Sequence, residues 1–240
     1  MNATMEGRRV LVTGSTKGIG RAVAAALAEA GAYVAVHGRD PSEVEAVAAE
    51  MDASASGRAV GVAADLTDPD ACAGLVEEVV SALGALNTVV NNAGLGIFKP
   101  ITELSVEEWR RQVDTNLGGV FYVCRAAMPH LIESGDGFVI NVGSLASRHA
   151  FGGGTGYNAS KFGLLGMTEA MMADVRNLGV RVSMLMPGSV DTGFGGREPS
   201  KERGWRLQAD DVAAAVLHML SYPPQAHVSR IEMRPSRPGS

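Results

Sequence analysis

The 240-residue sequence contains only two cysteines, Cys72 and Cys124, which lie far apart and outside any CxxC or Cys/His spacing. They cannot form a zinc site or a redox pair on this spacing, so we expect two buried, reduced thiols and no metal site. A chain of this mass buries roughly 70% of its unfolded surface, so one large core is feasible without disulfides or structural metals.

Long apolar runs and blocks of positive charge are also missing. No run of about 18 apolar residues occurs, and residues 1–9 are polar without an apolar core, which argues against export and membrane spanning. We therefore expect a cytoplasmic protein. Its 21 Lys plus Arg against 26 Asp plus Glu give a net charge of −5, and nucleic acid is not an expected partner because phosphate binding needs clustered positive charge.

Short runs rich in Val, Ile and Ala alternate with longer segments of helical period, a pattern that predicts βα units around a parallel sheet. The runs lack polar alternation, as expected for strands covered on both faces. No linker divides the chain, which predicts a single domain over residues 1–240. The predicted strands are 10–13, 33–37, 59–64, 88–91, 138–142, 181–186 and 229–233.

Helix starts are marked by capping residues. Asp40 and Asp68 each precede a proline at the first helical position, and Ser105 with Glu108 forms a capping box. Gly31 and Gly179 are candidates for the residue that follows a helix end. The predicted helices are 19–30, 41–52, 69–83, 105–132, 157–178 and 209–221, and the irregular segment 189–207 is predicted to be a mobile loop over the substrate.

A glycine-rich segment, TGSTKGIG over residues 13–20, joins the first predicted strand to an alanine-rich helix. Glycines there permit a tight turn and a close approach to a pyrophosphate held by helix amides. A plain tight turn is the alternative. The expected cofactor-binding residues of this segment are Gly14, Ser15, Thr16, Lys17, Gly18, Ile19 and Gly20.

The glycine spacing G-x-x-x-G-x-G resembles that of the short-chain dehydrogenase/reductase family, not the usual G-x-G-x-x-G fingerprint. Further matches follow in the family's order: Asn91-Asn92-Ala93-Gly94, Asn116, Ser144, Tyr157-Asn158-Ala159-Ser160-Lys161, Pro187-Gly188 and Thr192. The resemblance covers about residues 7–221 and is strongest to the 3-oxoacyl-[acyl-carrier-protein] reductases. It implies an α/β fold: a three-layer α-β-α, Rossmann-like single domain with a seven-stranded parallel sheet.

Tyr157 and Lys161 are spaced i, i+4, which places both on one face of a helix. A lysine ammonium about 4 Å from a phenol, at an effective dielectric near 20, supplies about 4 kcal/mol, or about three pKa units. This would bring the phenol close to the working pH. The resemblance implies that Tyr157 is the general acid for carbonyl reduction and the base for alcohol oxidation, and that Lys161 lowers its pKa and holds the nicotinamide ribose.

The resemblance also implies that Ser144 hydrogen-bonds the substrate oxygen and that Asn116 positions a water that resupplies the proton through Lys161. Taken alone, Asn116 is equally compatible with a buried amide bonded to backbone, and Ser144 with a residue of a strand-end turn.

The end of the second strand decides which cofactor is expected. It reads His37-Gly38-Arg39, without the acidic residue that binds ribose hydroxyls in NAD enzymes. Arg39 can donate to a 2′-phosphate in bidentate fashion, and the resemblance implies Lys17 as a second cation, so we expect NADP(H) in preference to NAD(H). A solvated Arg39 beside Asp40 is the alternative. Further cofactor contacts implied by the resemblance are Asp65, Leu66, Asn91, Ala93, Gly94, Pro187, Gly188, Val190 and Thr192, with Tyr157 and Lys161.

The substrate pocket is expected among residues 95–98, 145–151 and 189–207, with Ser144, Phe151 and Tyr157 as contacts. Its apolar members suit a hydrophobic ketone and equally suit ordinary packing. Residues 197–206 carry an excess of positive charge, which could attract an anionic carrier such as acyl-ACP or acyl-CoA. Such charged runs are more often a solvated surface.

The expected function is hydride transfer between NADP(H) and a ketone or secondary alcohol, with a 3-oxoacyl thioester as one candidate substrate. The alternatives are an NAD(H)-linked alcohol dehydrogenase and a non-catalytic NADP-binding sensor or scaffold. The long helices resemble the family's dimer interface, so a homodimer or homotetramer is expected. The proline-containing, basic C-terminal segment places the tetramer in doubt.

Overall fold

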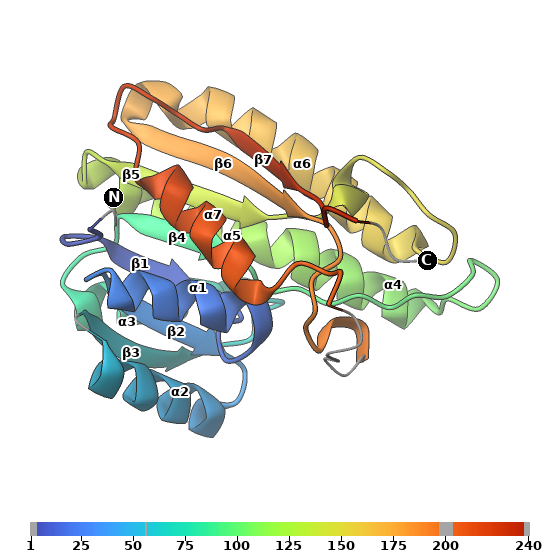
Figure 1. The fold of residues 1–240 in the computed structure, drawn as a ribbon, viewed down its shortest axis with the longest axis horizontal. Coiled ribbons are helices and arrows are strands. Elements are labelled where there is room, and N and C mark those ends of the chain that lie inside the picture. Colours follow the sequence, from blue (N-terminus) through green and yellow to red (C-terminus); the bar gives the residue numbers. More distant parts are fainter. Residues whose placement is uncertain (1–3, 56, 197–203, 238–240) are drawn as a thin grey trace.

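A parallel sheet of seven strands runs through the middle of the molecule with helices on both faces, as Figure 1 shows for the computed structural model, which describes residues 4–55, 57–196 and 204–237. The strand order is β3-β2-β1-β4-β5-β6-β7 and every pairing is parallel. This confirms the predicted fold class. The strands are β1 (Arg9–Val12), β2 (Tyr33–Gly38), β3 (Arg58–Ala63), β4 (Thr88–Asn91), β5 (Gly137–Val142), β6 (Val180–Pro187) and β7 (Arg230–Met233).

The helices form two layers, each with its own hydrophobic core. Side chains alternate along the strands, so Val10 and Val12 enter one core while Leu11 enters the other. One layer contains α1 (Gly18–Glu29), α2 (Pro41–Ser54) and α7 (Ala209–Leu220), and the other contains α3 (Pro69–Leu83), α5 (Gly119–Glu133) and α6 (Thr155–Val175). None of the helices in the described residues is long and apolar enough to cross a membrane.

The predicted caps are present. The Asp40 carboxylate accepts from the Ser42 and Glu43 amides, and Asp68 accepts from the first amides of α3 in the same way. Ser105 and Glu108 form the capping box of α4 (Val106–Val113). Gly31 and Gly179 have φ values of +95° and +79°, a backbone conformation that glycine adopts without a steric penalty at helix ends.

The predicted continuous helix over 105–132 is wrong in one respect. A π turn (Asp114–Gly118) separates α4 from α5. The turn contains Asn116, whose side chain hydrogen-bonds both backbone groups of Leu95 in the loop after β4. The wider turn accommodates an extra residue in the helix, and it brings Asn116 into contact with that loop.

Both cysteines are buried and free, as expected. Burial disfavours the thiolate, and it raises the pKa of Cys72 to about 11 and that of Cys124 to about 12. Both thiols are therefore protonated at neutral pH.

Candidate active site

The site residues lie where parallel strands end. The carboxyl ends of β1, β4, β5 and β6 meet at one edge of the sheet, and the loops that follow them extend beyond it on the right of Figure 1. In an open parallel sheet, ligands bind outside these ends, where the strand order reverses direction. Here that reversal lies between β1 and β4.

The glycine loop packs directly against the backbone after β4. Gly14 and Gly18 have φ values of +63° and +57°, and a Cβ atom at Gly14 would lie 2.8 Å from the Ala93 Cα. Helix α1 begins at Gly18, and the side chain of its N-cap residue, Lys17, caps none of the amides. The turn therefore presents helix amides without a side-chain cap, and its glycines allow a close approach to the backbone, which fits a pyrophosphate.

Asn92 holds this loop in place. Its Nδ2 donates to the carbonyl oxygens of Thr13 and Gly14 at 3.0 and 2.9 Å, while the Thr13 hydroxyl accepts from the Asn92 and Ala93 amides. Asn91, the predicted cofactor contact, instead directs its amide into the core toward Asn141 and Cys124. Successive side chains of a strand point to opposite faces, so alternation at the end of β4 is the signal that separates the two asparagines.

His37 is a second residue of the site that sequence reasoning missed. Its Nδ1 accepts from the Gly14 amide at 3.1 Å, so its Nε2 carries the proton and donates to the Ala64 carbonyl at 3.2 Å. Its backbone amide and carbonyl both bond Ser15. Burial lowers the pKa of His37 to about 4, so this neutral tautomer ties β2 to the glycine loop at neutral pH. A polar residue at the end of an otherwise apolar strand is the signal in the sequence.

The end of β2 presents positive charge to solvent. Gly38 lies under Thr16, where a Cβ atom would be 2.8 Å from the threonine methyl, so an acidic side chain has no room there. Lys17 and Arg39 are both exposed, and neither forms an ion pair with a described carboxylate. This donor set fits an adenosine 2′-phosphate.

The residues after β3 border the same surface. Asp65 accepts from the amide and hydroxyl of Thr67, which lowers its pKa, and Arg39 contributes a smaller lowering. Leu66 is buried, and a Cβ atom at Gly119 would lie 2.9 Å from it. The structure therefore places Leu66 mainly in the packing between α3 and α5.

Ser144, just after β5, comes together with Tyr157 and Lys161 in the first two turns of α6. The Ser144 hydroxyl bonds the Tyr157 phenol and also accepts from the Ala146 amide at 3.1 Å. Lys161 Nζ donates to the Val142 carbonyl at 3.0 Å and lies 5.9 Å from the centroid of the Tyr157 ring. All three residues of the predicted constellation therefore share one site.

The electrostatics of this constellation differ from expectation. Burial raises the pKa of the Tyr157 phenol, and the hydrogen bond from Ser144 lowers it only in part. Lys161 does not bring the phenol toward neutral pH, because its ammonium is bound to the Val142 carbonyl and is itself desolvated, with its pKa lowered to about 8. At neutral pH the phenol is therefore protonated.

Asn116 is fully buried beside Lys161. Its Nδ2 donates to the Leu95 carbonyl and the Ser160 hydroxyl, and its Oδ1 accepts from the Leu95 amide. Gly94 separates the two side chains, since a Cβ atom there would lie 3.0 Å from Asn116 Oδ1 and 3.8 Å from Lys161 Nζ. Asn116 thus binds backbone in the loop after β4, close to the lysine.

The loop after β6 begins beside the glycine loop. A Cβ atom at Gly18 would lie 3.6 Å from the Thr192 side chain, so Thr192 borders the same crevice. Pro187 ends β6, and the Gly188 amide donates to Met233 at 2.8 Å. Val190 pairs with Leu207 in a bridge at the base of the segment. Residues 197–203, which contain most of the predicted charge run, lie outside the described residues.

Three phenylalanines lie near Tyr157: Phe98, Phe151 and Phe194. We call these three residues the phenylalanine cluster. The ring centroids of Phe98 and Phe194 lie 5.4 and 5.7 Å from that of Tyr157, and Phe151 lies 5.8 Å from Phe98. Phe151 was the predicted substrate contact of this group, and the structure places it one ring away from Tyr157.

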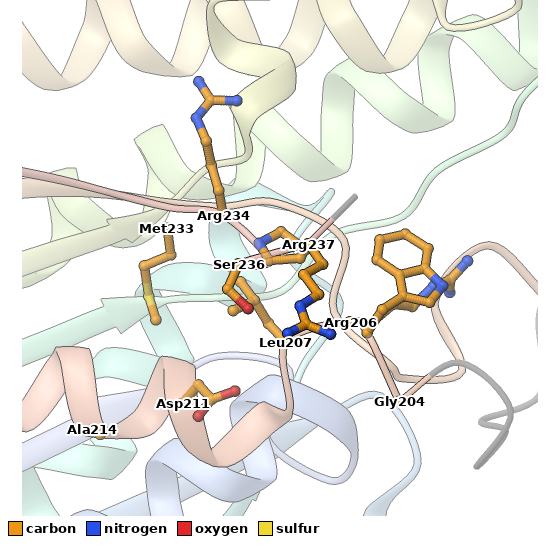
Figure 2. A pocket seen from close by; sticks show the side chains of 11 residues that line it. Gly204, Arg206, Leu207, Asp211, Ala214, Met233, Arg234, Ser236 and Arg237 are labelled. Atoms are coloured by element: carbon orange, nitrogen blue, oxygen red, sulfur yellow. The ribbon is translucent and has the colours of Figure 1, made fainter. Parts of the chain in front are cut away.

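A separate pocket of about 670 Å³ lies between residues 204–207, the start of α7 and the C-terminal segment (Figure 2). Its lining contains Trp205, Arg206, Asp211 and Arg237. In Figure 2 the Arg234 side chain points away from the other labelled side chains. None of Ser144, Tyr157 and Lys161 lines this pocket, so it borders the base of the loop rather than the catalytic constellation.

Comparison with known proteins places this geometry in one family. A family model described as short chain dehydrogenase matches residues 8–203. The sulfoacetaldehyde reductase 2 of Chromohalobacter salexigens is 33% identical over 239 residues, which cover 95% of this chain and 94% of that protein.

Two solved structures of similar proteins carry an NADP-type ligand. The alcohol dehydrogenase of the archaeon Thermococcus sibiricus, complexed with 5-hydroxy-NADP, superposes with a TM-score of 0.91 at 30% identity, covering 97% of this chain and 99% of that one. A metagenomic short-chain oxidoreductase in complex with NADP superposes with a TM-score of 0.84 at 32% identity, covering 99% of this chain and 100% of that one. The motifs, the parallel sheet and these matches together show that the chain belongs to the short-chain dehydrogenase/reductase family.

Proposed function

We propose that this protein is an NADP(H)-dependent carbonyl reductase that interconverts a ketone and a secondary alcohol. One observation carries the proposal: Ser144, a protonated Tyr157 and Lys161 meet beside a glycine loop whose neighbouring cations, Lys17 and Arg39, are exposed to solvent. The similar proteins that bind NADP or 5-hydroxy-NADP support the choice of cofactor.

The side chains have distinct roles in this proposal. Ser144 donates a hydrogen bond to the substrate oxygen, and Tyr157 donates its proton to that oxygen as negative charge develops. The raised pKa of the phenol suits this direction because the acid form dominates at neutral pH. Lys161, with a pKa of about 8, is a proton source of suitable strength for the phenol. The resemblance to the family assigns Asn116, which is bound to Leu95 and Ser160 beside Lys161, the positioning of a water between Lys161 and solvent.

The cofactor would bind across the crevice described above. When bound, NADP(H) supplies or accepts the hydride. The glycine loop would hold the pyrophosphate, and Lys17 and Arg39 would bind the 2′-phosphate. Gly94, Gly188, Val190 and Thr192 would border the nicotinamide half. Asn92 and His37 would not contact the cofactor; they would hold the glycine loop in place through their hydrogen bonds to Gly14.

The first experiment follows NADPH oxidation by the absorbance of the reduced nicotinamide over a panel of ketones and 3-oxoacyl thioesters of CoA and ACP. The thioesters belong in the panel because of the resemblance to 3-oxoacyl-[acyl-carrier-protein] reductases. Tyr157→Phe should retain NADPH binding and lose at least about a thousandfold in kcat, because it removes the only proposed proton donor to the substrate oxygen. Wild-type kcat in this variant would remove Tyr157 from the acid role.

The choice of cofactor is tested at Arg39. Arg39→Ala should raise the KM for NADPH at least tenfold, about 1.4 kcal/mol, and leave the KM for NADH within about twofold. Arg58→Ala is a matched control, because Arg58 is also exposed but lies at the opposite end of the sheet, at the start of β3. Equal changes for NADPH and NADH at Arg39 would favour an NAD(H)-linked dehydrogenase.

A further inference from the structure

The phenylalanine cluster indicates which chemical group lies next to the carbonyl of the substrate. This inference rests on the proposed function. Phe98, Phe151 and Phe194 come from the loops after β4, β5 and β6, so three separate segments each contribute one ring to the same place. The chain has only six phenylalanines, and half of them lie here. Ordinary packing would bury such rings, yet the three are 39%, 47% and 41% exposed.

The rings cover the reacting phenol. Tyr157 is 8% exposed, and its two aromatic neighbours, Phe98 and Phe194, stand in edge-on or tilted contact with it. The centroids of Phe98 and Phe194 also lie 6.5 Å from each other. A substrate that reaches the phenol must therefore part these rings and take their place beside it.

Glycines keep the rings close together. A Cβ atom at Gly96 would lie 2.7 and 2.8 Å from the rings of Phe98 and Phe194, and one at Gly154 would lie 2.7 Å from Phe151. Any side chain at these two positions would push the rings apart. A bridge between Lys99 and Gly154 also joins the first loop to the second.

The charged groups beside the cluster do not favour an anionic substrate. Lys99, next to Phe98, is bound to Glu108, and Arg148, three residues before Phe151, is bound to Glu232. Among the described residues, the cations flanking the cluster on these two loops are thus neutralised. On these two loops the described residues therefore offer no unpaired Lys or Arg to a sulfonate or carboxylate beside the carbonyl.

We propose that the substrate is a ketone with an aryl group next to the carbonyl, bound with its ring among Phe98, Phe151 and Phe194 and its oxygen on Ser144 and Tyr157. When Phe98 and Phe194 move away from Tyr157, an aryl group can pack against all three rings in the same offset and edge-on geometry. A saturated ring of similar size fills the volume without this geometry, and an anionic group gives up its hydration without gaining a counter-ion.

The test compares kcat/KM with NADPH for acetophenone, cyclohexyl methyl ketone, butan-2-one and sulfoacetaldehyde. We expect acetophenone to exceed each of the others at least tenfold. Phe98→Leu and Phe194→Leu should lower the acetophenone value at least fivefold more than the cyclohexyl methyl ketone value. Tyr33→Leu is the matched control, because Tyr33 is 41% exposed but begins β2 at the opposite end of the sheet.

Binding is measured apart from turnover in NADP⁺-loaded Tyr157→Phe protein. Isothermal titration should show at least tenfold tighter binding of 1-phenylethanol than of 1-cyclohexylethanol. Equal or better turnover of the saturated or anionic carbonyl, or equal losses on both ketones in Phe98→Leu, would overturn the aryl proposal and leave the reductase intact. Failure to oxidise NADPH with any carbonyl would overturn both.

Discussion

Lys161 is held by a carbonyl group instead of a carboxylate, and this choice has a chemical consequence. Val142 oxygen satisfies one ammonium proton but adds no negative charge, so desolvation lowers the pKa of Lys161 to about 8. The lysine remains mostly protonated at neutral pH and loses its proton just above it. A group of this strength can both release and regain a proton in each catalytic cycle.

The pH dependence of reduction should report this group. In the proposed mechanism Lys161 must be protonated to resupply Tyr157, so kcat for ketone reduction should be constant below the pKa of Lys161 and fall as the pH rises through about 8. The measurement is kcat with saturating NADPH from about pH 6 to about pH 10.

Lys161→Arg is the informative variant in that experiment. Arginine stays protonated over the whole range, so the residual activity of this variant should lack the fall near pH 8. A wild-type profile that is flat between about pH 7 and about pH 9 would contradict the role of Lys161.

The sequence sufficed to predict that Ser144, Tyr157 and Lys161 lie together, because Ser144 follows a strand and the other two share a helix face. It did not separate Asn91 from Asn92, because the orientation of each side chain depends on where β4 ends. It also overestimated the effect of Lys161 on the phenol, since spacing along a helix does not show that Val142 occupies the ammonium.

At the level of elements, α1 shows how tightly the cofactor loop and its helix fit together. A Cβ atom at Gly20 would overlap the Gly14 carbonyl and the Asn92 amide, so the first turn of α1 packs backbone against backbone. Gly74 in α3 is a contrasting glycine, exposed and with nothing within 4 Å of a Cβ atom.

These two helix glycines should respond oppositely to alanine. Gly20→Ala should lower the free energy of unfolding by about 1–3 kcal/mol through overpacking and weaken NADPH binding at least tenfold. Gly74→Ala should raise the free energy of unfolding by about 0.4–1 kcal/mol, because alanine has less conformational freedom in the unfolded chain and favours the helix. Urea unfolding and NADPH titration of both variants measure this. Equal stability changes would show that the packing at Gly20 is unimportant.

Helix starts were predictable because Asp40, Asp68 and Ser105 are local signals. The π turn was not predictable from local pattern, because its cause is a tertiary contact between Asn116 and Leu95, 21 residues apart in the chain. The aromatic enclosure of Tyr157 depends in the same way on three loops that meet only after folding.

At the scale of the whole molecule, two exposed rings lie on the two long helices α5 and α6, which pack against the same core. Phe121 on α5 is 47% exposed and Phe162 on α6 is 44% exposed, although a ring of this size is usually buried. The homodimer predicted from the sequence would place both rings in its interface. The edge strand β7 carries Arg230 and Glu232 instead, and charged edges discourage further pairing.

The dimer proposal predicts the effect of charge on this surface. Phe121→Glu with Phe162→Glu should convert a dimer into a monomer at micromolar concentration, since buried aromatic anchors often contribute about 2 kcal/mol or more each. Size-exclusion chromatography with light scattering gives the mass. Tyr33→Glu, an exposed ring on β2, should leave the mass unchanged, and a wild-type monomer would refute the interface.

The bridge between Val190 and Leu207 also affects how the sequence between these residues can change during evolution. The Asp191 amide donates to the Leu207 carbonyl at 2.8 Å and the Leu207 amide donates to Ser189 at 3.0 Å, so backbone hydrogen bonds join the two ends of the segment. Doubling the length of a closed loop costs only about 0.6 kcal/mol of entropy. Insertions and substitutions within residues 192–206 should therefore cost the sheet little stability. Substrate preference can change through this segment while Ser144, Tyr157 and Lys161 stay unchanged.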